Sequence, residues 1–443
     1  MLRLAACLLC LFDLAGAEEV CLLQRVQRRV FASKRQKLGQ NVSNNLTGST
    51  LTWRSQLEVL PGIPPGADDR DLPVASADAA GNLAIMSWWE TAFSLPGQVS
   101  LYVNEFSWWV WPNQGWKKAA DLTQIAKDAA PQDVDSEFGQ AAALNGQGVA
   151  VVFQETNPRK VFTFTDNQGS WSLLTILEFT SITVIQVDFG GNLFTALTPV
   201  VSAPNEILTF QLEGGSWVSR PTLQVGVATR EQAQDGQTLL VDTETAISFY
   251  AWDGAMKSWT PQQEITGPGG NVQELHVSGE FAIVLWSQDA ANPTRKLLSI
   301  YQRGSSNMWA QTFSEDFDTS IVPNRKAETS VSISASGKAA FFYRRKTDQK
   351  GVIKIYQELT GRWSATQEFT RDGPIDDEGG QVAISATAAV LASYTFPPPP
   401  PVPPRPSAIP FGVVYSSNPE PIPAWCYTLN WCKNMLKYKA IAR

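Results

Sequence analysis

The residues that most often carry out catalysis are scarce in this sequence of 443 residues. His276 is the only histidine, which excludes metal sites built from several histidines and argues against a serine–histidine–aspartate hydrolase. It lies in the alternating run VQELHVSGEF, where a packed or half-exposed strand residue is expected rather than a general base. No calcium loop of the pattern Asp-x-Asp-x-Asp-Gly occurs either. The sequence therefore predicts no metal site and no cofactor.

Paired carboxylates are the other catalytic chemistry that the composition allows, because two acidic side chains can hydrolyse a glycosidic bond. Asp133, Asp135 and Glu137 form one acidic run, and residues 376–378 form another. Both runs fall in expected loops, where acidic residues usually form a solvated surface. We therefore expect a protein that is not an enzyme, and a glycan-active hydrolase with loop carboxylates at a central opening is the alternative.

Side chains that could bind a ligand are more numerous than catalytic ones. Five tryptophans stand within 24 positions, from Trp88 to Trp111. An exposed indole can bind a sugar face or an apolar protein patch, although packing between strands is the plainer expectation. Two arginines begin the loop RRKTDQKG, and another lies in a proline-rich loop. The ligand-binding candidates are Trp88, Trp108, Trp111, Arg344, Arg345 and Arg405.

The proline-rich loop spans residues 396–410 and contains nine prolines, so a stiff polyproline II conformation is expected. Pro400, Pro403 and Arg405 fit the spacing of an SH3-domain ligand. A stiff spacer and a docking loop for a partner both explain the segment.

A repeat of short strands must position these candidates. An aromatic residue stands seven positions before a tryptophan in five places, and Tyr301 with Trp309 repeats the pair with one residue added. Turn residues lie between the two aromatics, which predicts a hairpin with the pair on neighbouring strands. Upstream of each pair come two apolar runs joined by a glycine turn, as in residues 329–369. Each copy therefore predicts a four-stranded antiparallel meander.

The copies number six, and a seventh begins at Gln381 without its tryptophan strand. The strand expected at Leu51–Leu60 matches the missing one. Six complete units and a split seventh predict an all-β fold, a seven-bladed β-propeller whose ring is closed by the N-terminal strand. The propeller is expected to span residues 51–416.

The repeats resemble the FG-GAP repeats of integrin-α-like propellers and, more loosely, kelch repeats. Phe138-Gly139 matches the FG element, and the order apolar run, glycine turn, apolar run, aromatic residue and Gly-x-Trp recurs. The resemblance implies a propeller fold. The calcium binding of many FG-GAP blades is not carried over, because the metal loop is absent.

The segments outside the propeller predict export. Residues 1–17 combine an early Arg3, an apolar run and a small-residue cleavage site, which is typical of a signal peptide. Cys21, Cys426 and Cys432 remain after cleavage, and the last two can close a small disulfide loop. Residues 18–50 are a basic and largely flexible lead-in, with glycosylation sequons at Asn41 and Asn45.

Charge is unevenly distributed along the chain, whose net charge is −7. Residues 18–50 and residues 421–443 each carry +4, which leaves −15 for the body between them. An acidic body argues against a nucleic-acid partner. The basic and aromatic C-terminal tail, residues 417–443, is expected to rest on the acidic propeller, and any membrane contact would be made by this tail.

These observations together predict a secreted, extracellular or cell-surface protein, expected to be a monomer, that binds a protein or a glycan. The alternatives are the hydrolase described above and a structural component of the cell envelope.

Overall fold

In a computed structural model, the chain consists of two units, Met1–Leu51 and Thr52–Arg443. All residues described below belong to the second unit. They are residues 53–59, 74–89, 97–104, 116–135, 137–156, 158–179, 186–198, 204–226, 229–243, 245–268, 270–287, 294–319, 329–348, 350–370, 377–386, 388–395 and 409–417.

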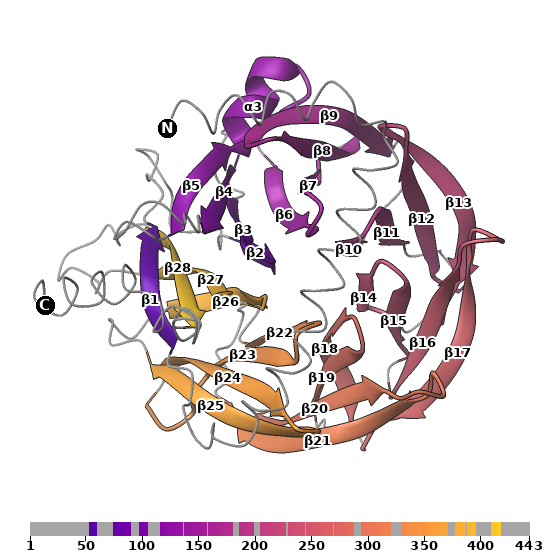
Figure 1. Cartoon of the computed structure of the whole chain (residues 1–443), viewed down its shortest axis with the longest axis vertical. Helices are drawn as coiled ribbons and strands as arrows, with labels where there is room; N and C mark the ends of the chain where they lie inside the picture. Colours follow the sequence, from indigo (N-terminus) through magenta and orange to yellow (C-terminus); the bar gives the residue numbers. More distant parts are fainter. Residues whose placement is uncertain are drawn as a thin grey trace, which may run out of the picture. The chain divides into compact units, whose positions relative to one another are not determined.

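The strands of this unit form seven four-stranded antiparallel sheets arranged in a ring (Figure 1). We number these sheets as blades in chain order, and within a blade the first strand lies innermost and the fourth outermost. Blade one comprises β2 (Val74–Ala80), β3 (Leu83–Trp89), β4 (Gln98–Asn104) and β5 (Trp116–Asp121). Blade two comprises β6 (Phe138–Leu144), β7 (Val149–Gln154), β8 (Arg159–Asn167) and β9 (Ser170–Phe179). Blade three comprises β10 (Gln186–Gly190), β11 (Leu193–Thr198), β12 (Glu206–Glu213) and β13 (Ser216–Gln224).

The remaining blades repeat this order. Blade four comprises β14 (Gln232–Asp235), β15 (Thr238–Asp242), β16 (Ala246–Asp253) and β17 (Ser258–Thr266). Blade five comprises β18 (Asn271–Ser278), β19 (Phe281–Ser287), β20 (Arg295–Arg303) and β21 (Trp309–Asp318). Blade six comprises β22 (Thr329–Ser334), β23 (Lys338–Arg344), β24 (Gly351–Leu359) and β25 (Arg362–Thr370). A short helix, α3 (Leu122–Ala129), follows blade one, with the Asp121 carboxylate accepting from the Gln124 backbone as its N-cap.

Blade seven is built from both ends of the described chain. It contains β26 (Asp377–Ile384), β27 (Ala388–Thr395), β28 (Ile409–Ser417) and, as its outermost strand, β1 (Trp53–Val59). The register of β1 on β28 runs from Trp53 opposite Ser417 to Val59 opposite Gly412. The predicted seven-bladed propeller and its closure by the N-terminal strand are therefore confirmed.

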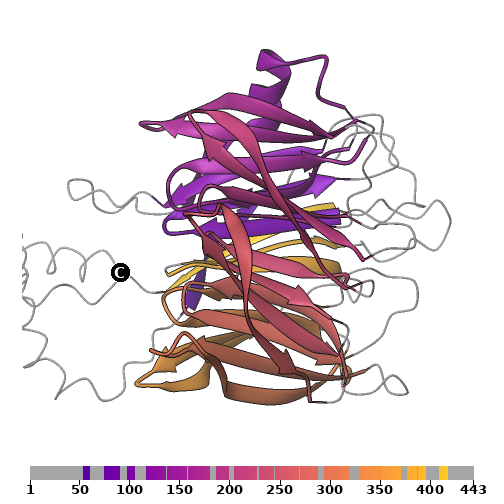
Figure 2. The ribbon, with the colours of Figure 1, turned by 90° about the vertical axis from the view of Figure 1, so that its right-hand side faces the viewer.

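The two ends of the ring differ in the connections they carry. In blade six the Glu358 backbone donates to the Gly337 carbonyl at 2.8 Å, so the turn between the first two strands lies beside the turn between the last two. Gly337 has φ +73°, a conformation that glycine adopts without strain. We call the end with both sets of turns the turn face. The opposite end, which carries the connections between second and third strands and between blades, is the loop face. Figure 2 shows the strands running from one end to the other.

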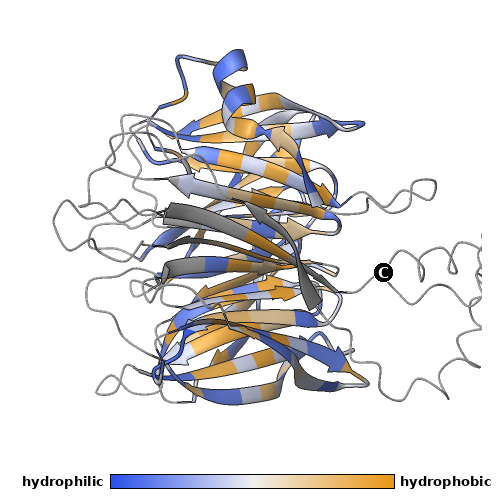
Figure 3. Cartoon of the chain, turned by 90° about the vertical axis from the view of Figure 1, so that its left-hand side faces the viewer, coloured by the Kyte–Doolittle hydropathy of each residue, from blue (hydrophilic) through white to orange (hydrophobic). Residues whose placement is uncertain are grey.

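Apolar side chains pack between neighbouring blades. Figure 3 shows the hydrophobic residues distributed along the strands. One core cluster, for example, joins Phe281 and Ile283 of blade five to Phe341 of blade six. The aromatic pairs predicted from the repeat do lie on neighbouring strands wherever both partners are described, and Trp252 and Trp259 are direct cross-strand partners. Within the described ranges no helix combines the length and the apolar character needed to cross a membrane.

Candidate functional site: the central channel

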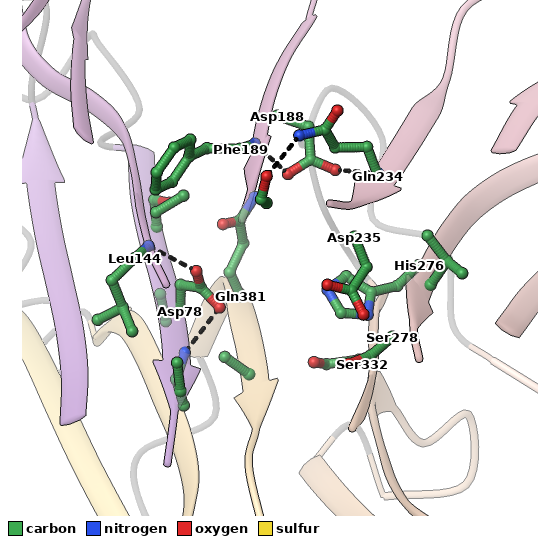
Figure 4. Close-up of a pocket in the computed structure, with 18 of the residues that line it drawn as sticks. Asp78, Leu144, Asp188, Phe189, Gln234, Asp235, His276, Ser278, Ser332 and Gln381 are labelled. Atoms are coloured by element: carbon green, nitrogen blue, oxygen red, sulfur yellow. Dashed lines mark hydrogen bonds between the residues drawn. The ribbon is translucent and has the colours of Figure 1, made fainter. Parts of the chain in front are cut away.

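The seven innermost strands surround a central cavity of about 1560 Å³. Its wall includes three aspartates at the end that leads to the turn face, namely Asp78, Asp188 and Asp235. His276 lies next to Asp235 in this region, as Figure 4 shows. We call this cavity the central channel.

Many of the polar side chains in the channel wall accept hydrogen bonds from the backbone of the next blade. The seam between blades five and six shows this most fully, because three alternate residues of β18 accept from two alternate N–H groups of β22 and from the first residue after it. The pairs are Glu274 with Val331 at 2.9 Å, His276 with Ile333 at 3.2 Å, and Ser278 with Ala335 at 3.0 Å.

The same arrangement recurs at other seams. In blade one, Ser76 accepts from the Ala142 N–H of blade two at 3.3 Å, and Asp78 accepts from the Leu144 N–H at 2.8 Å. In blade three, Asp188 accepts from the Gln234 N–H of blade four at 2.7 Å. In blade six, Ser330 and Ser332 accept from the N–H groups of Val382 and Ile384 of blade seven, both at 3.1 Å. Asp235 similarly accepts from the Gly279 backbone across the seam between blades four and five.

These contacts have a simple physical reason. An innermost strand is the edge of its sheet, so alternate N–H groups face away from the blade and need acceptors. Side chains at alternate positions of the preceding blade's innermost strand point toward that edge. At five of the seven seams, the polar wall of the channel therefore satisfies N–H groups of an open sheet edge as well as facing a ligand-sized space.

Burial of three acidic side chains in this wall changes their acidity. Loss of hydration raises the pKa of Asp78 to about 6, that of Asp188 to about 7 and that of Glu274 to about 8. Hydrogen bonds from the backbone act in the opposite direction and are smaller in effect. Repulsion from Asp235 adds to the upward shift of both aspartates. These groups can therefore hold protons near neutral pH, so the channel offers both donors and acceptors.

His276 is the opposite case, because burial lowers its pKa to about 4. The ring nitrogen Nδ1 accepts from the Ile333 N–H at 3.2 Å, which leaves the proton of the neutral ring on Nε2. A neutral imidazole held in this way is a structural acceptor at the seam. The expectation that His276 is a packed or half-exposed strand residue agrees with this placement.

The acidic run proposed for carboxylate chemistry lies in a separate polar cluster beside blade two. The Lys160 amine lies 2.9 Å from the Asp133 carboxylate, and the Gln154 amide donates to Asp135 at 2.9 Å. Burial raises the pKa of both Asp135 and Glu137. These hydrogen bonds fix the connection between α3 and β6. Of the second run, Asp377 and Glu378 begin β26, and their side chains lie outside the described part of the structure, as does Asp376.

The ligand-binding candidates from the sequence do not gather at the channel. Trp88 is 4% exposed and packs in the core between blades one and seven. Arg344 is 8% exposed at the end of β23, whereas Arg345 pairs with Glu368 of β25. Their binding roles stay predictions. Trp108, Trp111, Arg405, Cys426 and Cys432, and with them the proline-rich loop, the signal peptide and the lead-in, lie outside the described residues.

The channel aspartates were not singled out in the sequence. A usable signal was present on three of the innermost strands, where acceptor residues alternate as Ser-x-Asp in β2, Glu-x-His-x-Ser in β18 and Ser-x-Ser in β22. Among the described residues no group of three or more histidine, cysteine, aspartate or glutamate side chains is arranged to hold a metal ion.

Comparison with known proteins gives structural likeness alone. No protein-family model matches the chain, and no curated protein matches it significantly. The FG-GAP and kelch resemblances therefore stay predictions.

The chain is similar to solved structures at low sequence identity. Kluyveromyces lactis Hsv2 has a TM-score of 0.46 and 10% identity, over 74% of this chain and 94% of that one. Saccharomyces cerevisiae Sqt1 has a TM-score of 0.42 and 11% identity, over 79% of this chain and 97% of that one. A Lactobacillus plantarum protein has a TM-score of 0.42 and 10% identity, over 66% of this chain and 83% of that one. Likeness of this degree carries no functional assignment.

Proposed function

We propose that the protein is a binding module, not an enzyme, that takes part of a protein or glycan partner into the central channel. The observation that carries the proposal is that acidic groups of the channel and its histidine accept backbone hydrogen bonds at the blade seams. Glu274 and His276 each accept a backbone N–H from blade six, and Asp188 accepts one from blade four. Groups held in this way are rigid hydrogen-bonding partners for a ligand, and moving one as a catalyst would break the seam.

The chemistry of the wall suggests which ligands fit. The wall contains carboxyl groups with pKa values of about 6 to 8, and it also carries hydroxyls of β22 such as Ser332. Such a wall both donates and accepts hydrogen bonds, which suits the hydroxyls of a glycan or the backbone and side chains of an extended peptide. Location outside the cell, as the N-terminal sequence predicts, is part of the same proposal.

An obstructed channel provides the test. Gln381 lies exposed in the channel wall, and Gln381→Trp would place a bulky indole in the channel without removing a described seam bond. The full chain is assayed on a glycan array and by affinity capture with cross-linking, and the affinity of each ligand found is then measured for the variant. We expect at least a tenfold loss. Thr370→Trp, on the exposed end of an outermost strand, is the matched control and should bind normally. Unchanged binding by Gln381→Trp would refute the channel as the binding site.

One observation favours the hydrolase as a second candidate. Carboxyl groups with pKa values near neutrality, as for Asp188 and Glu274, are typical of general acids. Turnover of glycoside substrates by the full chain, abolished in both Asp188→Asn and Glu274→Gln while the fold is retained, would establish this function. Absence of turnover with binding retained would favour the binding module.

A further inference from the structure

The turn face is where the described chain ends. Ser416 of β28 lies opposite Ala388, which borders the turn between β26 and β27, and Ser417 lies opposite Trp53 at the start of β1. The chain therefore leaves blade seven at the turn face. Residues 418–443, which we call the C-terminal tail from here on, continue from this point.

The same face carries a row of exposed apolar side chains. Met256, Met308 and Leu359 are 61%, 51% and 52% exposed, and they are the three most exposed of the large hydrophobic side chains described. Each stands at the turn between the third and fourth strands, in blades four, five and six respectively. The three side chains stand at the corresponding turns of three consecutive blades on the same face, and we call them together the apolar arc.

Acidic groups border this arc. Asp235 lies at the turn of blade four and Glu280 at the turn of blade five, both on the channel side of the apolar residues. Glu358 is next to Leu359 in blade six. The same turns also carry Asp253 and four basic residues, Lys257, Arg303, Lys338 and Arg362. Lys257 pairs with Glu213 at 3.0 Å, Arg303 lies over the Trp309 ring at 5.6 Å, and Lys338 donates to the Ala386 carbonyl, whereas Arg362 is an exposed cation on this face.

The composition of the C-terminal tail matches this surface. The tail contains four basic residues and one acidic residue, together with Trp425, Tyr427 and Trp431. Aromatic residues are the side chains that most often anchor an apolar contact, and lysines complement carboxylates at its edge. With 26 residues, the tail has an extended reach of about 85 Å, enough to cross from blade seven to the opposite side of a propeller.

We propose that the C-terminal tail docks on the turn face of its own propeller, with its aromatic residues on the arc of Met256, Met308 and Leu359 and its lysines toward Asp235, Glu280 and Glu358. Covalent attachment at Ser417 makes the contact intramolecular, so a weak interaction is sufficient to keep the tail on the face. The docking itself does not depend on the channel's ligand.

Zero-length carbodiimide cross-linking of the full chain tests the proposal, because this reagent joins a lysine amine to a carboxylate only in direct contact. We expect peptides that join Lys433, Lys437 or Lys439 to Asp235, Glu280 or Glu358, with a yield that is independent of protein concentration. A yield that grows with concentration would instead indicate docking on a second copy. Products that carry lysines of residues 18–50, and none from the tail, would indicate that the lead-in occupies the face. Either outcome, or the absence of cross-links to this face, overturns the proposal.

Hydrogen exchange gives a second readout that does not require a reactive pair. In the triple variant Lys433→Glu, Lys437→Glu and Lys439→Glu, the amides of residues 253–258 and 303–309 should exchange at least threefold faster than in the natural chain. The matched control is the double variant Lys127→Glu and Lys346→Glu, on exposed positions away from the turn face, which should leave these amides unchanged. Equal exchange in the triple variant and the natural chain would also overturn the proposal.

Discussion

The indole nitrogen of Trp259 in blade four donates a hydrogen bond of 3.0 Å to the hydroxyl of Thr209 in blade three. Trp217 of blade three repeats the contact with Thr163 of blade two at 2.7 Å. In blade five Trp309 stacks on Phe249 of blade four with ring centroids 4.6 Å apart. The repeated tryptophan therefore joins each of these outermost strands to the preceding blade.

Trp259→Phe should destabilise the ring by about 1 kcal/mol, because the aromatic packing is kept and one buried hydrogen bond is lost. Trp259→Ala also opens a cavity and should cost about 3–5 kcal/mol. Urea unfolding measures both values. In a double-mutant cycle, Thr209→Val should add little to Trp259→Phe, and fully additive effects would contradict the hydrogen bond.

His276→Leu should destabilise the protein by about 1–3 kcal/mol, because the buried N–H of Ile333 loses its acceptor. His276→Asn is the matched control, since its side-chain oxygen occupies nearly the position of Nδ1 and should recover most of the loss. Unfolding by urea gives the difference. If leucine and asparagine prove equally tolerated, the seam bond contributes nothing.

The stability of the fold should fall as the pH rises from about 5 to about 8. The pKa of Asp188 rises from 3.8 to about 7 on folding, so between these values the folded state holds a proton that the unfolded state has lost. Asp78 and Glu274 act in the same direction, whereas the lowered pKa of His276 acts oppositely between about 4 and 6.5.

Asp188→Asn isolates one contribution to this pH dependence. The free energy of unfolding should fall less steeply with pH in the variant than in the natural chain. The difference in slope should reach about 1.4 kcal/mol per pH unit between pH 5 and 7, whatever the variant's overall stability. Chemical unfolding at several pH values is the measurement. If the free energy of unfolding changes with pH equally in the variant and the natural chain, Asp188 has an ordinary pKa.

Gly190→Ala should be strongly destabilising, because a Cβ atom at this position would stand 2.6 Å from the Gly236 backbone nitrogen of the next blade. Backbone must then move, and we expect a loss of about 1–3 kcal/mol. Gly254→Ala is the control, since nothing lies within 4 Å of its added Cβ. Equal melting temperatures for the two variants would contradict this close approach of blades three and four.

The sequence was sufficient to predict the propeller because each blade is specified locally. Alternating apolar residues, glycine turns and the repeated tryptophan all lie within one repeat, and the split seventh repeat predicts how the ring closes. Thr329–Ser334 and the three strands that follow lie where the meander of residues 329–369 was expected.

The channel could not be predicted in the same way, because its contacts join different repeats. His276 and Ile333 are 57 positions apart, and Ser76 and Ala142 are 66 apart. Which acceptor meets which N–H depends on the angle between blades, which no single repeat encodes. The pKa values of Asp78 and Asp188 follow from the burial that this ring assembly creates.

The pairing of Trp53 with Ser417 also determines how the protein responds to mechanical force. The two strands that close blade seven are antiparallel, and the ends through which the chain continues lie side by side. Tension applied between the N-terminal and C-terminal segments would break the β1–β28 hydrogen bonds one after another, as in unzipping, rather than loading all of them at once. The ring would therefore open at low force when pulled by both ends.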